Sequence, residues 1–380
     1  MSWRAPLSPG ATVTASRRRK AVPVGGSPEE PETEGGTVRA YIGSYTSEGG
    51  AGITTASLDP DSGALTALHS TDTVSNPSFL TASPSGDRLY AVSETREGAA
   101  GGLLLGDGTA PPALVSAMVP VQADAPTHLT LFQEHVVTAN YGSGSVTLLP
   151  VEPDGGLGHA RHVLRHHGDG PNRERQRGPH AHGVWPDPSG ELLLSVDLGT
   201  DSVRVCTLEP EGALRIRREI RMAPGSGPRH LAFHPDGERL FVINELQPTV
   251  TTCRWDPANA ELESLADTAV LPEGTPPEAA FPSEVVVSPD GRFLWVAVRG
   301  TDVIALLTLE TPDGLPRLVT AVGCGGQGPR HLTLGPRNDR LYAANQRSGD
   351  VAWFDFDPAT GVPRRTGSMP APAASCVLFV

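Results

Sequence analysis

Two positions of a repeated sequence unit carry polar side chains that change from one copy to the next. In "GPRHLAFHPDGERLFVINE" (227–245) they are Arg229, which follows a proline, and Glu245, which ends an apolar run. In "GPRHLTLGPRNDRLYAANQ" (328–346) the same positions hold Arg330 and Gln346. A purely structural repeat would keep matching apolar or turn-forming residues there. Varied polar residues on a uniform scaffold are typical of a site built onto a fold.

Aligning all copies of the unit defines two sets of such residues. The first set lies just after an early proline: Ser78, Thr127, His182, Arg229, Ser283 and Arg330. The second set ends the apolar run: Tyr45, Glu94, Tyr141, Leu198, Glu245, Arg299 and Gln346. Carboxylate and imidazole groups can activate water, and arginines can stabilise an oxyanion or bind phosphate or carboxylate. A buried, unpaired Glu245 would be costly, so we expect it to be catalytic, to form an ion pair with Arg229 or Arg299, or both.

The spacing of the unit predicts the fold. The last residues of six copies are separated by 47, 57, 47, 54 and 47 residues, and no segment shows a helical pattern of apolar residues. A period of about 50, made of strands and Pro-x-Gly turns, is typical of stacked four-stranded sheets. Residues 38–65 and 370–380 look like the two halves of a further unit. We predict an all-β, seven-bladed β-propeller, closed by pairing the C-terminal strand with N-terminal strands; six blades with capping ends is the alternative.

A propeller brings corresponding residues of all blades together, because its inner strands line one central channel. We therefore expect Glu245 to face Arg299 across the channel mouth. His230 and His331 each follow an arginine on a strand, where successive side chains point to opposite faces. We expect these two histidines to point away from the arginines and to hydrogen-bond between blades.

Three motifs of other protein classes lack the context that those classes need. "PHAH" places His180 and His182 on one face of a strand, but no carboxylate shares the motif, so a metal site is only an alternative. "GCGGQG" (323–328) precedes a strand and opens no helix, which argues against a dinucleotide site. G-x-S-x-G does not occur, so a serine-hydrolase nucleophile is not predicted.

Composition indicates a globular protein without a nucleic-acid or membrane partner. The formal net charge is -13 with scattered basic residues, and no apolar run is long enough to cross a bilayer. The four cysteines lie far apart, as buried residues in a reducing cytoplasm would: Cys206, Cys253, Cys324 and Cys376. Residues 1–36 are rich in Pro, Gly, Ser and charge, so we expect a disordered tail before one propeller domain over 37–380. We expect a cytoplasmic protein that is a monomer or a weak homodimer.

Several segments together carry a family resemblance: "YIGSYT", "PHAHGVWPDPSGELLLSVDLGTDSV", "GPRHLAFHPDGERLFVINEL", "FPSEVVVSPDGRFLWVAVRGTD" and "PAASCVLFV". Over residues 38–380 the chain resembles the lactonase family of seven-bladed propellers. The resemblance implies an enzyme that opens or closes a lactone without a cofactor or a metal. Carried over by motif, the family's proposed catalytic residues fall on His182, Arg229, Glu245 and Arg299.

The resemblance further implies hydrolysis of a sugar lactone, with 6-phosphoglucono-1,5-lactone as the expected substrate. Glu245 or His182 would activate the water, and Arg229 and Arg299 would stabilise the oxyanion or hold an anionic group. The basic segment 161–177, with Arg330, would reach a phosphate. Further residues expected to contact substrate are Tyr45, Glu94, His180 and Gln346.

Two other functions stay open at this point. The same arginines could serve an enzyme that lactonises or hydrolyses a muconate-type or other carboxylic acid. A non-catalytic propeller would instead bind partner proteins, and it predicts polar residues spread over a rim. Because the polar residues gather at two repeat positions, we favour an enzyme whose partner is a small, anionic lactone.

Overall fold

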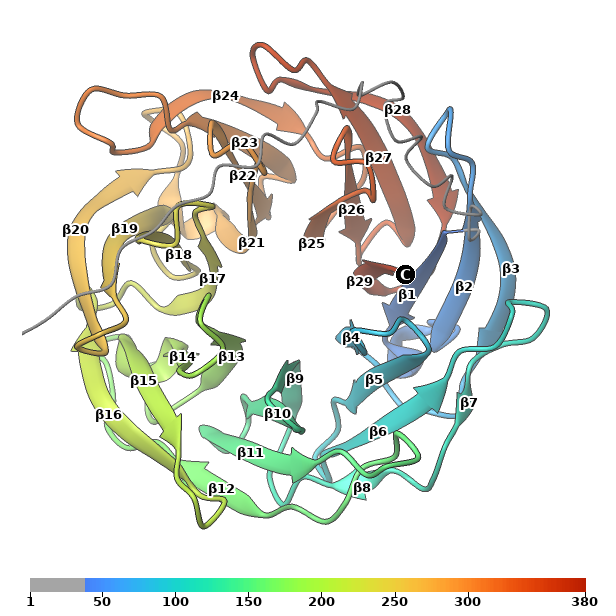
Figure 1. Ribbon diagram of the computed structural model, residues 1–380. Helices are drawn as coiled ribbons and strands as arrows, with labels where there is room; N and C mark the ends of the chain where they lie inside the picture. The colour runs from blue at the N-terminus through green and yellow to red at the C-terminus, as the bar shows by residue number, and fades with distance from the viewer. Residues whose placement is uncertain (1–37) are drawn as a thin grey trace, which may run out of the picture. The chain divides into compact units, whose positions relative to one another are not determined.

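Seven antiparallel β-sheets surround a central axis in residues 38–380, the part of the chain that the computed structural model describes (Figure 1). Each sheet is one blade, and one strand of each blade lies nearest the axis. The predicted seven-bladed propeller is confirmed, and the six-bladed alternative is wrong. The expected disordered tail, residues 1–36, lies outside the described residues.

In five blades the four strands follow the chain from the axis outward. The first two are β9 (Pro126–Phe132), β10 (His135–Asn140), β11 (Ser145–Pro150), β12 (His162–Arg165), and β13 (Ala181–Pro186), β14 (Leu193–Asp197), β15 (Ser202–Leu208), β16 (Leu214–Arg221). The next two are β17 (Pro228–Phe233), β18 (Arg239–Asn244), β19 (Thr249–Asp256), β20 (Glu261–Ala269), and β21 (Phe281–Val287), β22 (Phe293–Arg299), β23 (Val303–Thr308), β24 (Arg317–Gly323). The fifth is β25 (Pro329–Leu334), β26 (Arg340–Asn345), β27 (Asp350–Phe356), β28 (Pro363–Pro370).

One blade departs from four simple strands. It contains β4 (Leu80–Ala82), β5 (Arg88–Ser93) and β6 (Ala99–Leu104), and β6 pairs on its outer side with both β7 (Ala113–Leu114) and β8 (Val119–Pro120). The outer position is therefore shared by two short strands. The helices of the described residues are three short 3₁₀ turns: η1 (Thr46–Glu48), η2 (Leu198–Thr200) and η3 (Pro277–Ala279). In this part of the chain, no helix has the length and apolar character needed to cross a bilayer.

The remaining blade joins the two ends of the chain. Its innermost strand is β29 (Ala374–Phe379), which pairs antiparallel with β1 (Arg39–Ser44); β2 (Ile53–Leu58) and β3 (Leu65–Thr71) complete the sheet. The inner strands then contact one another in an unbroken ring, from β4 through β9, β13, β17, β21 and β25 to β29 and back to β4. This is the predicted closure, and it leaves no blade without a neighbour on either side.

The hydrophobic core is divided among the seven interfaces between neighbouring blades. One apolar cluster, for example, joins Phe241 and Val250 of one blade to Leu294 and Val296 of the next. Two others flank the joined blade on its two sides. Each blade packs both of its faces against neighbouring blades, so side chains on both faces are buried. The strands therefore show little of the alternation of apolar and polar residues that is typical of a sheet with one face in solvent.

The turn between the first and second strands of a blade explains the repeated Pro-x-Gly motif. In "HPDGE", Gly237 has φ +72° and its N–H donates to the carbonyl of His234 at 3.0 Å. Asn338 takes the same place in "GPRND", with φ +56°. Glycine and asparagine are the residues that adopt this left-handed conformation most readily, so the motif selects a tight hairpin.

A β-bulge interrupts the pairing of six of the seven inner strands near their beginning. In β17, Pro228 lies opposite Asn244 and His230 lies opposite Ile243, so Arg229 has no partner in the register. The residues skipped in this way are Thr127, His182, Arg229, Ser283, Arg330 and Ser375. Five of them belong to the first set of polar residues that the sequence predicts. A bulge re-aims side chains and is common beside active sites.

The joined blade supplies a stability test. A Cβ atom at Gly43 of β1 would overlap the Pro77 carbonyl oxygen and lie 2.8 Å from Sγ of Cys376 in β29. We expect Gly43→Ala to lower the free energy of unfolding by about 1–3 kcal/mol, because the closing seam is overpacked. Urea denaturation would measure this loss.

The matched control is Gly106→Ala, where an added Cβ meets nothing within 4 Å. Its unfolding free energy should stay within about 0.5 kcal/mol of the wild type. Equal urea midpoints for Gly43→Ala and Gly106→Ala would contradict the claim that the contacts around Gly43 are too close for an added methyl group.

Candidate active site

The two sets of polar residues meet at one end of each blade. The backbone N–H of Glu245 donates to the Gly227 carbonyl at 2.8 Å, and that of Gln346 donates to the Gly328 carbonyl at 2.9 Å. In the neighbouring blade, Arg299 lies opposite Phe281 in the register. These contacts place each residue of the second set beside the start of the inner strand of its own blade. The bulge in that strand holds the residue of the first set. Both sets therefore lie at the same end of the inner strands, the strands that surround the axis in Figure 1.

Glu245 lies at the centre of an ion cluster. Its Oε2 atom accepts from Nε of Arg229 at 3.1 Å and from Nη2 of Arg299 at 2.7 Å, and its Oε1 atom accepts from Nη2 of Arg175 at 2.6 Å. Glu245 is only 4% exposed. The expected ion pairs with Arg229 and Arg299 are both present, and they join two neighbouring blades.

The three arginines control the protonation of this carboxylate. Burial alone would raise the pKa of Glu245, but the positive charges of Arg299, Arg229 and Arg175 outweigh burial and lower the pKa to about 2. The group is ionised at neutral pH and is a very weak base. Its chemistry is therefore to hold the arginines in place by accepting their hydrogen bonds.

The arginines also act on one another. Burial first, and then the charges of Arg299 and Arg330, lower the pKa of Arg229 to about 9. Arg175, Arg229, Arg299 and Arg330 form ion pairs with two carboxylates, those of Glu245 and Glu94, and a third carboxylate, Glu284, acts on Arg229 from beyond ion-pair distance. Four positive charges against three negative ones leave positive charge in excess. Such a site favours a small anion.

Three residues predicted to bind substrate form a second group at the same end. Tyr45 donates from Oη to Oε2 of Glu94 at 2.7 Å, and the guanidinium carbon of Arg330 lies 5.2 Å from the centre of the Tyr45 ring. Nη2 of Arg330 is 4.0 Å from Glu94. Within residues 38–380 the Arg330 guanidinium donates no hydrogen bond, so its donors are available to a ligand.

The predicted histidines and Gln346 take different places. Nδ1 of His180 lies 2.8 Å from the Tyr141 carbonyl oxygen, and its ring stacks on Tyr141, so His180 supports that ring. His182 is buried with its ring 5.6 Å from Tyr141 and 5.2 Å from His230, measured between ring centres. Gln346 donates to Glu48 at 2.8 Å, at the exposed rim. None of these three contacts the ion cluster around Glu245 directly.

Arg175 is the functional candidate that residue-by-residue reasoning missed. It lies in the segment between β12 and β13, where the Asn172 side chain accepts from the Arg175 N–H and Gln176 donates to Asp201. This anchored turn directs the guanidinium to Glu245, and Nη2 also lies 3.3 Å from the Tyr141 hydroxyl. The basic character of segment 161–177 was the available signal, but it did not single out one arginine.

The expectation for His230 and His331 is wrong in one respect. Both histidines line the same small cavity as Arg229 and Arg330, which precede them in the chain. The bulge before each histidine breaks the strict alternation of side chains, so the two neighbours turn to a common side. Contacts between blades do occur, because Nδ1 of His230 lies 2.9 Å from Oε1 of Glu284, a buried residue that the sequence did not single out.

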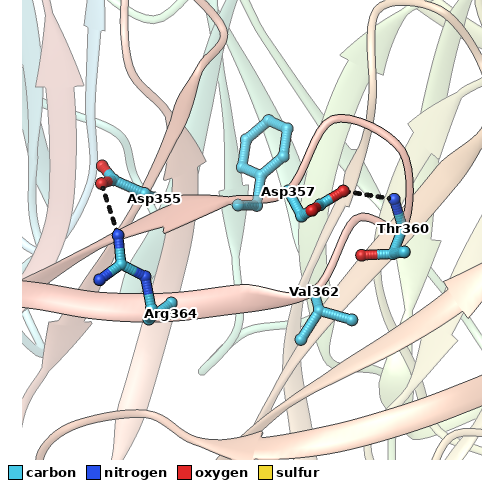
Figure 2. A pocket seen from close by; sticks show the side chains of 6 residues that line it. Asp355, Asp357, Thr360, Val362 and Arg364 are labelled. Carbon is cyan, nitrogen blue, oxygen red and sulfur yellow. Dashed lines mark hydrogen bonds and ion pairs between the residues drawn. The ribbon is translucent and has the colours of Figure 1, made fainter.

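A larger pocket lies away from this site, on β27 and β28 near the edge of a blade (Figure 2). Its charged groups bind one another: Asp355 accepts from Arg364 at 3.5 Å, and Asp357 accepts from the Thr360 N–H at 3.0 Å. Asp355 and Asp357 are thus engaged by neighbours on the same two strands and their turn, and neither group belongs to the arginine-rich end of the channel. Among the described residues, no three or more His, Cys, Asp or Glu side chains form a group that could hold a metal ion.

Seven blades with an arginine-rich end of the channel define a β-propeller with a charged site on its axis. The model of the family described as "Lactonase, 7-bladed beta-propeller" matches residues 39–379, and the chain belongs to this family. This match confirms the family resemblance seen in the sequence. It also confirms that the protein is a lactonase enzyme.

Individual relatives agree over nearly the whole chain. A Bacillus subtilis protein named 6-phosphogluconolactonase is 30% identical over 346 residues, which cover 90% of this chain and 97% of that protein. A Bacteroides fragilis crystal structure has a TM-score of 0.85 at 29% identity and covers 92% of this chain and 100% of its own. The structure of the Pseudomonas aeruginosa periplasmic gluconolactonase has a TM-score of 0.83 at 29% identity, over 90% of this chain and 99% of that one.

The low pKa of Glu245 makes the stability of the protein depend on pH. We expect Glu245→Gln to lower the unfolding free energy by about 3–5 kcal/mol at neutral pH, because three arginines lose their counter-charge. The carboxylate stabilises the fold fully above its ordinary pKa of 4.5, and this stabilisation is lost as pH falls toward about 2. The difference between wild type and variant should therefore shrink by roughly 1 kcal/mol per pH unit in that range.

Urea denaturation from neutral to acidic pH would measure this difference. Glu97→Gln, which removes an exposed carboxylate, controls for the loss of one negative charge. A difference between wild type and Glu245→Gln that stays constant from neutral pH to about pH 3 would contradict the shifted pKa.

Proposed function

We propose that this protein hydrolyses 6-phosphoglucono-1,5-lactone to 6-phosphogluconate. The observation that carries the proposal is the excess of positive charge at the channel end of a lactonase-family propeller. A phosphorylated lactone is an anion, and its hydrolysis forms a second anionic group. The name of the Bacillus subtilis relative supports the same substrate.

Lactone hydrolysis requires positive charge beside the carbonyl oxygen, where negative charge develops in the transition state. Arg330 and Arg229 line the small cavity at the channel end, and the Arg330 guanidinium donates no hydrogen bond to any residue of 38–380. We assign these two arginines to the carbonyl oxygen. Arginine suits this role because it stays protonated and presents several N–H groups in one plane.

The phosphate requires a guanidinium that reaches solvent. The Arg175 side chain is 36% exposed, compared with 19% for Arg299 and 3% for Arg229. We therefore assign the phosphate to Arg175, with Arg299 beside it. Glu245 orients these arginines and is too weakly basic to activate water, although the sequence made it a candidate base.

We further propose that the enzyme works in the cytoplasm, where its product would enter the pentose phosphate pathway. All four cysteines are buried and free, as suits a reducing compartment: Cys206, Cys253, Cys324 and Cys376. The Pseudomonas aeruginosa relative is named a periplasmic enzyme, so relatives of this fold occur in more than one compartment.

An assay with a phosphorylated and an unphosphorylated lactone distinguishes phosphate binding by Arg175 from a role in the hydrolysis itself. Wild type should hydrolyse 6-phosphoglucono-1,5-lactone with a much higher kcat/KM than glucono-1,5-lactone. Arg175→Ala should raise KM for the phosphorylated substrate about 10- to 100-fold, which corresponds to about 1.5–3 kcal/mol for a charge-assisted contact. It should change the kinetics on glucono-1,5-lactone little.

Arg177→Ala is the matched control, because Arg177 belongs to the same loop, is exposed and donates to the Arg173 carbonyl. It should leave both reactions unchanged. Equal loss on both substrates in Arg175→Ala would remove the phosphate role. A wild type that prefers a muconate-type lactone, or hydrolyses no lactone, would overturn the proposed substrate.

A further inference from the structure

The small cavity at the channel end is bounded by reactive side chains. Arg229, Arg330, His230 and His331 line it, together with the hydroxyl group of Ser78. Its volume is about that of one water molecule. These groups come from two inner strands, β17 and β25, and from the segment before β4, so the cavity lies where the blades converge.

His230 and His331, the two histidines that line this cavity, differ in the ring nitrogen that faces Glu284. Nδ1 of His230 lies 2.9 Å and 3.1 Å from the two carboxylate oxygens of Glu284. Glu284 is itself buried, and Oε1 accepts from the Val285 N–H at 3.1 Å. Burial raises the pKa of Glu284, against the charges of His331 and Arg229, which favour the ionised form. In that form the carboxylate can only accept, so the imidazole proton belongs on Nδ1 and Nε2 keeps its lone pair. Nε2 is buried and has no hydrogen-bond partner among the described residues.

We propose that His230 is the general base of the reaction and that Glu284 is its positioning residue. His230 would accept the proton of a water molecule held in the cavity beside Arg229 and Arg330. Glu284 would hold the Nδ1–H tautomer and stabilise the imidazolium that forms. This inference rests on the proposed lactone hydrolysis and names the group that activates its water.

Other candidate bases lack one part of this arrangement. Glu245 is surrounded by arginines, and within residues 38–380 His182 contacts no carboxylate. Nδ1 of His128 accepts from the Val184 N–H at 3.4 Å, and His128 does not line the cavity. Nδ1 of His331 accepts from the Val377 N–H, and Nε2 lies 3.6 Å from Glu284. Among contacts within residues 38–380, His230 is the one histidine that both lines the cavity and contacts a carboxylate through Nδ1.

The charges around His230 keep its imidazole neutral before the reaction. Burial first, and then Arg229 on its own strand, lower the pKa of His230 well below 6.5. Charged and titratable groups that face it from other strands are Glu284 on β21, Arg299 on β22, Arg330 and His331 on β25, His128 on β9 and His182 on β13. Glu284 is the one group among them that favours a proton on His230.

The proton balance of the step is complete. The water oxygen forms a bond to the lactone carbonyl carbon while one water proton moves to Nε2 of His230. The oxyanion faces Arg330 and Arg229. The bond between the carbonyl carbon and the ring oxygen then breaks, and His230 returns its proton to that oxygen. The product is a hydroxy acid, whose carboxyl group ionises to the carboxylate and releases one proton.

The test compares four variants on 6-phosphoglucono-1,5-lactone and on glucono-1,5-lactone: His230→Gln, Glu284→Gln, His182→Gln and His128→Gln. His230→Gln should lower kcat about 10²- to 10⁴-fold on any lactone that the wild type hydrolyses, with KM changed less than about threefold. Glu284→Gln should lower kcat about 10- to 100-fold and move the acidic limb of the kcat/KM profile to lower pH, since the imidazolium loses its counter-charge. A purely structural role would not move this limb.

His128→Gln is the control, because His128 has the same position after a bulge and its ring lies 5.1 Å from His230. It should retain wild-type kcat. Retained activity in His230→Gln, or loss in His182→Gln alone, would overturn the proposal while leaving lactone hydrolysis intact. A wild type inactive on every lactone would overturn the proposed function and this inference together.

A second measurement does not depend on the folding of variants. In wild-type protein labelled with ¹⁵N at histidine, the His230 signals should report a proton on Nδ1 and a bare Nε2 at neutral pH. A proton on Nε2 would exclude His230 as the base. Circular dichroism and thermal unfolding of each variant would separate loss of chemistry from loss of fold.

Discussion

Each bulged inner strand carries one residue more than the strand beside it can pair. The extra residue stands near the channel end, as Arg229 does between Pro228 and His230. Regular alternation would turn the arginine and the following histidine to opposite faces, and only one could reach the axis. With the bulge, both line one cavity. The closed ring of inner strands then brings six such bulges together, so the charged site depends on a backbone irregularity repeated around the propeller.

This concentration of side chains would be unstable without a counter-charge. Arg229 and Arg299 come from neighbouring blades and Arg175 from a loop, and each donates to Glu245. The carboxylate therefore ties three separate segments to one point. Because Glu245 cancels only part of the positive charge, the site keeps an excess, as the proposed phosphorylated substrate requires. The ion cluster stabilises the closed propeller and prepares the binding site by the same contacts.

Most of the fold could be predicted from the sequence, because turns and repeat spacing are visible in short stretches of the chain. Pro-x-Gly turns and a regular period reveal the blades, and the half units at the chain ends reveal the closure. The contact between Glu245 and Arg299 also followed, since both occupy one repeat position. Arg175 could not be identified, because the path of a long loop depends on anchors such as Gln176 and Asp201. The His230–Glu284 contact was hidden too, since a bulge appears only when the register of paired strands is known.

A crystal structure of the protein with bound 6-phosphogluconate would show which end of the channel holds the product and in which orientation. We expect the new carboxylate at Arg330 and Arg229, facing His230, and the phosphate at Arg175. Product bound in the outer pocket of Figure 2, or with its phosphate in the cavity beside His230, would contradict this expectation.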